Sequence, residues 1–258
     1  MDLHYRVGQT VDFANIEDVK SIKELILHDC TINNLSQIFR AENIKTVAFI
    51  NCNITDKDLV HLKTLPKLKT VILGIMPIRS IRCLSEIPTL RELSFRQMHD
   101  LDYSELQYFP KLLTLSIKET NITSLDFLEK IKGLKCLELN EIPLTNLNFL
   151  KYTKKLREFN MMYSVEDETA LSELLNIRYL KTFQYPVPDM TLYRNCPIIN
   201  SIGVDSSRVK NLDALAGMDT IREVFFYNLT SREQFEEQLA EVKKHLRLSS
   251  YSEYIDEE

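Results

Sequence analysis

The sequence has little glycine and no tryptophan. Only 5 of its 258 residues are glycine, and none of the glycine-rich patterns that hold phosphates or dinucleotides occurs. The patterns GxSxG, HExxH and CxxC are also absent, which removes the usual sequence signals of serine hydrolases, zinc proteases and cysteine-based zinc sites. The sequence therefore predicts no enzyme activity, no catalytic residue, no metal ligand and no cofactor.

Long apolar runs and paired cysteines are missing as well. No uncharged stretch approaches the roughly 18 residues that span a bilayer, and the N-terminus lacks the apolar core of a signal peptide. The five cysteines follow no paired spacing, which favours a reduced, cytoplasmic protein. A formal net charge of −5 makes nucleic acid an unlikely ligand, because non-specific binding to phosphates needs a basic surface.

What the sequence does contain is a repeat of about 22 residues. Residues 134–144 carry large apolar side chains at positions 1, 4, 6, 9 and 11, and most units along the chain keep this spacing. Ten units begin at Ile22, Ile44, Leu68, Leu90, Leu112, Leu134, Leu156, Leu180, Ile199 and Ile221. Alternation at positions 4 and 6 predicts a short strand with one buried face. Apolar residues at every third place in the second half predict a helical or 3-10 turn, so stacked units would share one core.

This pattern resembles the leucine-rich repeat family, LxxLxLxx(N/C)xL, and its period is similar to that of the short, internalin-like subclass. The resemblance implies an α/β solenoid with a curved parallel β-sheet on its concave side, short helical or 3-10 turns on its convex side and a C-terminal capping helix. The family's ninth position, usually Asn or Cys, matches only at Cys30 and Cys52, so less regular stacking is expected in the middle units. A disulfide between these two cysteines is conceivable, and two buried thiols are the favoured interpretation.

Three regions are expected along the chain. Residues 1–21 form an N-terminal partial repeat or cap, residues 22–230 form the ten units, and residues 231–258 form a capping helix and a mobile acidic tail. Ser231 and Gln234 match a capping box at the start of that helix, whose apolar face would shield the last layer or, alternatively, dock a partner. Pro186 predicts a kink in the repeat that contains it.

Positions 5, 7 and 8 of each unit should face the concave side, because successive strand residues alternate between the faces of a sheet. The early units place an apolar patch there, the central ones charges and the late ones aromatic residues, as in many protein-binding surfaces. The predicted contact residues are Ile26, His28, Ala48, Ile50, Ile72, Ile75, Arg96, Lys118, Glu119, Glu141, Met162, Tyr163, Phe225 and Tyr227. The hypothesis is a monomeric, non-catalytic scaffold that binds another protein on this face and regulates or neutralises it.

The alternative hypothesis uses position 2, which is basic in eight of the ten units. Lys23, Lys45, Lys69 and Arg91 would form a rim along the sheet that binds nucleic acid or polyphosphate. Glutamates beside Lys23 and Arg91, together with the negative net charge, favour an ordinary solvated rim instead.

Overall fold

The computed structural model describes residues 2–6, 8–162, 169–173, 179–187, 189–194 and 199–255. The chain forms two compact units, Met1–Gly133 (unit 1) and Leu134–Glu258 (unit 2).

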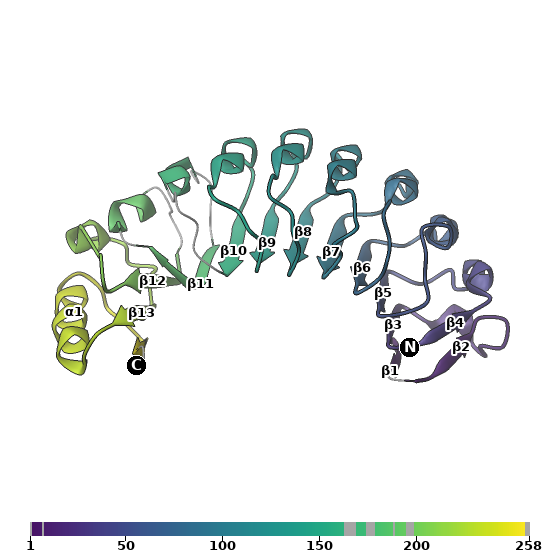
Figure 1. Ribbon diagram of the computed structural model, residues 1–258, viewed down its shortest axis with the longest axis horizontal. Helices are drawn as coiled ribbons and strands as arrows, with labels where there is room; N and C mark the ends of the chain where they lie inside the picture. Colours follow the sequence, from purple (N-terminus) through teal and green to yellow (C-terminus); the bar gives the residue numbers. More distant parts are fainter. Residues whose placement is uncertain are drawn as a thin grey trace. The chain divides into compact units, whose positions relative to one another are not determined.

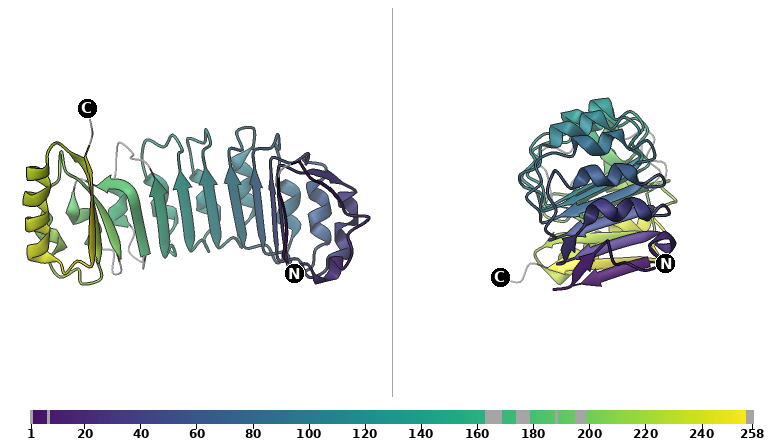
Figure 2. Two further views of the ribbon diagram at one scale, coloured as in Figure 1. Left: turned by 90° about the horizontal axis from the view of Figure 1, so that it is seen from below. Right: turned by 90° about the vertical axis from the view of Figure 1, so that its right-hand side faces the viewer.

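Unit 1 is built on a parallel sheet in which strands follow one another in chain order (Figure 1). Its described strands are β1 (Asp2–Arg6), β3 (Glu24–His28), β5 (Thr46–Ile50), β6 (Thr70–Gly74), β7 (Glu92–Arg96) and β8 (Thr114–Lys118). Two shorter strands, β2 (Thr10–Asp12) and β4 (Thr31–Asn33), pair beside this sheet. Figure 2 shows the strands of unit 1 side by side, with its 3-10 turns on the other side of the sheet.

A 3-10 turn lies between successive strands of this sheet and buries apolar residues about every third place. These turns are η1 (Val19–Ser21), η2 (Leu35–Arg40), η3 (Leu59–Thr64), η4 (Arg82–Glu86), η5 (Tyr103–Tyr108) and η6 (Asp126–Lys130). In η3, for example, Leu59 and Leu62 are fully buried while Lys63 and Thr64 are exposed. The turns therefore close the core from the side opposite the sheet.

The core of unit 1 consists of two rows of side chains on the buried face of the sheet. Leu25, Val47, Val71 and Leu93 pair in register along β3, β5, β6 and β7, and none is more than 1% exposed. The second row is Leu27, Phe49, Leu73 and Phe95, which are all 0% exposed. Burying one such side chain contributes about 1.5–3 kcal/mol. The prediction that apolar residues at the repeat spacing line one shared core under a parallel sheet is confirmed in unit 1.

The ninth position stays regular where the sequence predicted looser stacking. Cys30, Cys52, Met76, Met98 and Thr120 are all 8% exposed or less, and strands β6, β7 and β8 keep an unbroken register past them. Large thioether side chains fill the same space as the usual Asn or Cys, so the expected irregularity in unit 1 is wrong. Cys30 and Cys52 are buried and form no disulfide.

Unit 2 repeats the same plan with more irregular strands. Its described strands are β9 (Cys136–Asn140), β10 (Glu158–Met162), β11 (Tyr179–Val187), β12 (Ser201–Asp205), β13 (Glu223–Leu229) and β14 (Ser250–Ile255). Its turns are η7 (Asn148–Tyr152), η8 (Thr169–Glu173), η9 (Met190–Tyr193) and η10 (Leu212–Leu215). The register between β11 and β12 shifts between Lys181 and Pro186, which confirms the irregularity predicted at Pro186. Cys196 lies outside the described residues.

The helix α1 (Arg232–His245) covers the end of unit 2, as the sequence predicted. Phe235, Leu239 and Val242 are buried on its inner face, and the ring of Phe235 meets that of Phe226 edge-on at 5.5 Å. The amide N–H of Gln234 donates to Ser231 Oγ at 3.1 Å, while Gln234 Oε1 accepts from the amide N–H of Thr230 at 2.8 Å. The helix start is thus capped from both sides.

The tail does not match its prediction. Ser250–Ile255 forms β14, which pairs in parallel with β13 and ends the sheet of unit 2. Glu253 pairs with Phe226, a core position, and forms an ion pair with Arg232 of α1. The ion pair of Glu253 and Arg232 thus takes a place that an apolar side chain fills in the other repeats. Charged groups on the last strand separate the apolar core from water, as the polar outer faces of terminal repeats do in solenoids.

Candidate partner-binding surface

The predicted contact residues of the early units lie together on the solvent face of the sheet in unit 1. Two rows run across the strands: Ile26, Ala48, Ile72 and Ser94 in one, and His28, Ile50, Gly74 and Arg96 in the other. Ile26, Ile50 and Ile72 are half-buried. A solvated sheet face normally carries polar side chains, so three isoleucines on this face are unusual.

Ala48 does not contribute the exposed surface that the sequence predicted. It is 2% exposed, because its single methyl group lies in the row between the larger side chains of Ile26 and Ile72. Gly74 is buried as well, and a Cβ placed there would lie 3.5 Å from Ile50 Cγ2. The side chain of Ile50 therefore lies over Gly74, and the apolar surface is continuous from β5 to β6.

Ile75 extends this surface at the end of β6. It is 41% exposed and has a left-handed backbone with φ of 54°. Its amide N–H donates to the carbonyl of Arg96 at 3.0 Å, which continues the sheet ladder by one residue. Ile26, Ile50, Ile72 and Ile75 are called the apolar surface below.

A polar cluster borders the apolar surface toward β3. His28 Nδ1 lies 2.6 Å from Asp29 Oδ2, and Asn51 Nδ2 donates to the other oxygen of the same carboxylate. Asp29 and Asn51 have left-handed backbones, as Ile75 does. The Asp29 carboxylate therefore lies between the side chains of His28 and Asn51.

A second polar cluster borders the apolar surface toward β8. Arg96 Nε lies 2.7 Å from Glu119 Oε1, and the Arg96 side chain is 57% exposed. Gln97 Nε2 donates to Glu119 Oε2. Lys118 pairs in register with Arg96 and directly precedes Glu119 in the chain. The predicted central charges Arg96, Lys118 and Glu119 are therefore brought together.

The remaining predicted contact residues belong to unit 2. Glu141 is exposed and Tyr227 is half-buried, whereas Tyr163 and the side chain of Met162 lie outside the described residues. Phe225 is only 9% exposed, which corrects its prediction as a surface aromatic. The reason is β14: Ser252 pairs with Phe225, so β13 is not the edge strand that the repeat pattern implied.

The basic residues at position 2 form the expected row. The amide N–H of Lys45 donates to the carbonyl of Lys23, that of Lys69 to Lys45 and that of Arg91 to Lys69. Arg91 is half-buried, and its Nη1 donates to the carbonyls of Pro88 and Leu90 at 2.9 and 2.6 Å. The guanidinium is therefore turned toward the backbone rather than toward a ligand.

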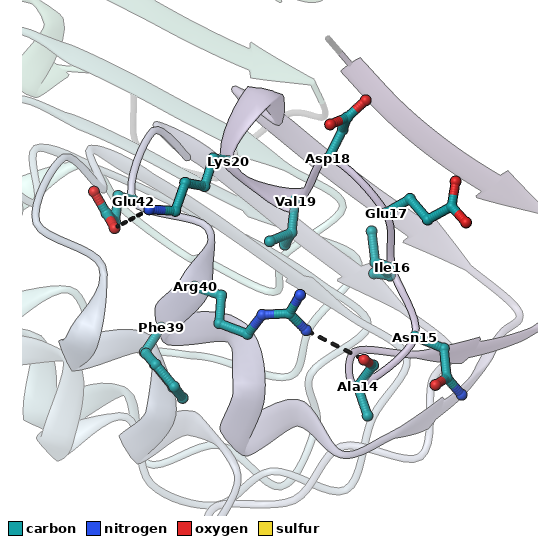
Figure 3. A pocket seen from close by; sticks show the side chains of 10 residues that line it. All are labelled: Ala14, Asn15, Ile16, Glu17, Asp18, Val19, Lys20, Phe39, Arg40 and Glu42. Carbon is teal, nitrogen blue, oxygen red and sulfur yellow. Dashed lines mark hydrogen bonds and ion pairs between the residues drawn. The ribbon is translucent and has the colours of Figure 1, made fainter.

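A hollow of about 660 Å³, shown in Figure 3, was not predicted from the sequence. It lies between η1 and η2, and Arg40 Nη1 donates there to the carbonyls of Phe13 and Ala14 at 3.1 and 3.2 Å. Lys20 Nζ and Glu42 Oε1 form an ion pair of 3.3 Å. Arg40 acts as a clamp between residues 27 apart in sequence, a contact for which the repeat pattern offers no signal.

Two further features are absent from the described residues. They contain no group of three or more His, Cys, Asp and Glu side chains placed to hold a metal ion. No helix in the described part of the chain is both long and apolar enough to cross a membrane.

Comparison with solved structures identifies the fold. An internalin (InlF) of Listeria monocytogenes superposes with a TM-score of 0.66 at 16% identity, over 93% of this chain and 75% of that one. Internalin C2 of the same organism gives a TM-score of 0.58 at 19% identity, over 72% and 82%. A chain of the Toll–Spatzle complex of Drosophila gives 0.61 at 12% identity, over 95% and 39%.

The sequence itself matches no family model and no curated protein. At these low sequence identities, the structural similarity is evidence for the fold alone. The protein thus has the leucine-rich repeat fold, similar to that of the internalins, as the resemblance in its repeat pattern implied.

Proposed function

We propose that this protein is a non-catalytic scaffold that binds a partner protein on the apolar surface of unit 1 and thereby regulates or neutralises that partner. The observation that carries the proposal is the apolar surface itself. Isoleucine is poorly solvated, and apolar side chains bordered by charge are typical of protein-binding surfaces. Ile26, Ile50, Ile72 and Ile75 lie between the clusters of Asp29 and Glu119 in this way.

Two further observations support the proposal. The fold is one in which a neighbour was solved as part of a complex, that of Toll and Spatzle. None of the described cysteines forms a disulfide, which suits a scaffold that works as a monomer in the reducing cytosol.

The experiment is a pair of matched double variants. Ile50→Asp with Ile72→Asp places two charges on the apolar surface, where each carboxylate can still reach water. Phe39→Asp with Val60→Asp places two charges on the opposite side of the sheet, on η2 and η3, where these side chains are 50% and 42% exposed.

Each immobilised protein is exposed to extract of its native cells, and the bound proteins are quantified by mass spectrometry. Charging the apolar surface should remove the partner, because an unpaired buried charge costs several kcal/mol in an interface. The variant on η2 and η3 should retain the partner. Circular dichroism checks that both variants fold. Equal capture by all three proteins contradicts the proposal.

A further inference from the structure

A small hollow lies in unit 1 between the segment that leads from η4 to β7 and the segment that leads from η5 to β8. Its volume is about 170 Å³, well below the roughly 300 Å³ at which pockets for drug-sized ligands begin. Four of the residues that line it are buried and apolar: Ile87, Leu90, Phe109 and Leu112. Pro88, Pro110 and Tyr108 line it as well and are exposed. A hollow of this size and lining holds one or two apolar side chains.

Tyr108 distinguishes this place from the same place in the other repeats of unit 1. The turns η1 to η6 end on Ser21, Arg40, Thr64, Glu86, Tyr108 and Lys130, so one aromatic residue stands among polar ones. Tyr108 is 43% exposed, and the guanidinium carbon of Arg82 lies 3.0 Å from the centre of its ring. The attraction between a cation and a ring face holds the Tyr108 ring in place before any ligand binds.

The two prolines complete the hollow. Pro110 follows Tyr108 by two residues, and Pro88 holds the same place after the end of η4. Tyr152 ends η7 of unit 2 in a similar way, but Lys154 stands two residues later instead of a proline. The tyrosine and the two rigid rings therefore form a combination that the repeat spacing does not require.

The hollow offers hydrogen-bond donors more readily than acceptors. Within the part of the chain that the structure describes, the Tyr108 hydroxyl and the Lys111 ammonium group make no hydrogen bond or ion pair. Four carbonyls of the lining residues already accept: those of Ile87 and Phe109 from the amides of Leu90 and Leu112, and those of Pro88 and Leu90 from Nη1 of Arg91. A ligand that presents carbonyls but few N–H groups fits this arrangement best.

We propose that this hollow binds a proline-rich segment of a partner protein in the polyproline II conformation. Proline has no backbone N–H, so it needs no acceptor from the hollow. A polyproline II helix has no internal hydrogen bonds, so its carbonyls can accept from Tyr108 and Lys111. Grooves lined by aromatic residues bind such segments. One proline ring of the segment lies against Tyr108, between Pro88 and Pro110. This site is separate from the apolar surface and goes beyond the proposed function.

The test is a library of random peptides displayed on phage and selected on the full chain. Enriched peptides should contain two prolines separated by two residues more often than the starting library, because three residues make one turn of a polyproline II helix. An enriched peptide is then synthesised with a fluorescein label and titrated by fluorescence anisotropy. Tyr108→Thr should bind it at least about tenfold more weakly, as for an aromatic interface anchor. Tyr108→Phe should bind it about two- to tenfold more weakly, since one hydrogen bond is lost.

Tyr152→Thr is the matched control, because Tyr152 also ends a turn and has a cation over its ring, with Lys151 Nζ at 4.9 Å from the ring centre. This variant should bind the peptide as the unmodified protein does. Circular dichroism checks that all the variants fold. The proposal is overturned if no peptide is enriched, if the enriched peptides contain no excess of proline, or if Tyr108→Thr binds normally.

Ile50→Asp with Ile72→Asp separates this site from the apolar surface. The double variant should bind the peptide normally, whether or not it captures the partner of the proposed function. If it loses the peptide, the peptide lies on the apolar surface, and the proposal for the hollow fails while the proposed function stands. If it keeps both the peptide and the captured partner, and Tyr108→Thr loses the peptide, the proposed function fails while the hollow stands.

Discussion

Asn53 joins two neighbouring turns of unit 1 through the backbone of Ile32. Its Oδ1 accepts from the Ile32 amide N–H at 2.6 Å, and its Nδ2 donates to the Ile32 carbonyl at 3.1 Å. Ile32 belongs to β4, whose other edge pairs with β2. The amide side chain of Asn53 therefore takes the place of a third strand, and Asn53→Ala removes both of its hydrogen bonds at once.

The expected loss follows from these two bonds. A hydrogen bond contributes about 0.5–1.5 kcal/mol net, so the pair is worth about 1–3 kcal/mol. Water can reach the exposed Asn53 position and partly replace the lost groups. We therefore expect Asn53→Ala to lower the free energy of unfolding of unit 1 by about 1–2 kcal/mol, measured by urea unfolding followed by circular dichroism.

Asn121 is the control, because it occupies the same tenth position of a later repeat. It is exposed, and its side chain makes no hydrogen bond within the described residues. Asn121→Ala should change the free energy of unfolding by less than about 0.5 kcal/mol, as ordinary surface substitutions do. Equal losses from the two substitutions, or no loss from Asn53→Ala, would refute the strand-like role of the Asn53 side chain.

Two further predictions concern the core and the acid response. Phe95→Ala should destabilise unit 1 by about 3–5 kcal/mol in the same unfolding assay, because Phe95 is 0% exposed and meets Tyr103 edge-on at 5.8 Å. A loss below about 1 kcal/mol, roughly what burying a single methylene contributes, would contradict tight packing. Burial raises the pKa of Asp205, but hydrogen bonds from Arg208, Ser207 and Asn228 outweigh it and hold the pKa below its ordinary value. The resulting stability is present above the unfolded pKa of about 3.9 and is lost as the pH falls through the lower folded pKa. Asp205→Asn should therefore lose less stability than the unmodified protein when the pH falls below about 4. An unchanged dependence of stability on acid pH would contradict this.

The stacked strands were predictable because every repeat has apolar residues at the same two strand positions. Two apolar residues, such as Leu25 and Leu27, alternate on a strand that is too short to bury them alone. Ten copies at one spacing leave stacking as the only common solution. The cap helix was predictable for a similar reason, since Phe235, Leu239 and Val242 form one face.

The last strand was not predictable from the same pattern. In β14, Tyr251 pairs with the core residue Val224, but Glu253 occupies the second core register and its charge pairs with Arg232. One of the two apolar residues that mark the strands of the repeats is therefore missing. Phe225 was consequently expected at the edge of the sheet and is buried instead.

The sequence predicted which residues lie on the solvent face of the sheet, but not how exposed each of them is. The repeat pattern predicts both Ala48 and Ile75 on the concave face. The size of the neighbouring isoleucines buries Ala48, and the left-handed turn exposes Ile75. Neither side-chain size in adjacent repeats nor the sign of φ is part of the repeat spacing. The hydrogen bonds from Arg40 to the carbonyls of Phe13 and Ala14 were not predictable either, because the repeat spacing carries no signal for them.

The most direct test of the central claim is the amount of partner protein captured by Ile50→Asp with Ile72→Asp, relative to Phe39→Asp with Val60→Asp. If the apolar surface of unit 1 is the binding site, the first pair loses the partner and the second retains it, while both fold. Capture that survives the first pair and disappears with the second would place the site among the outer turns instead.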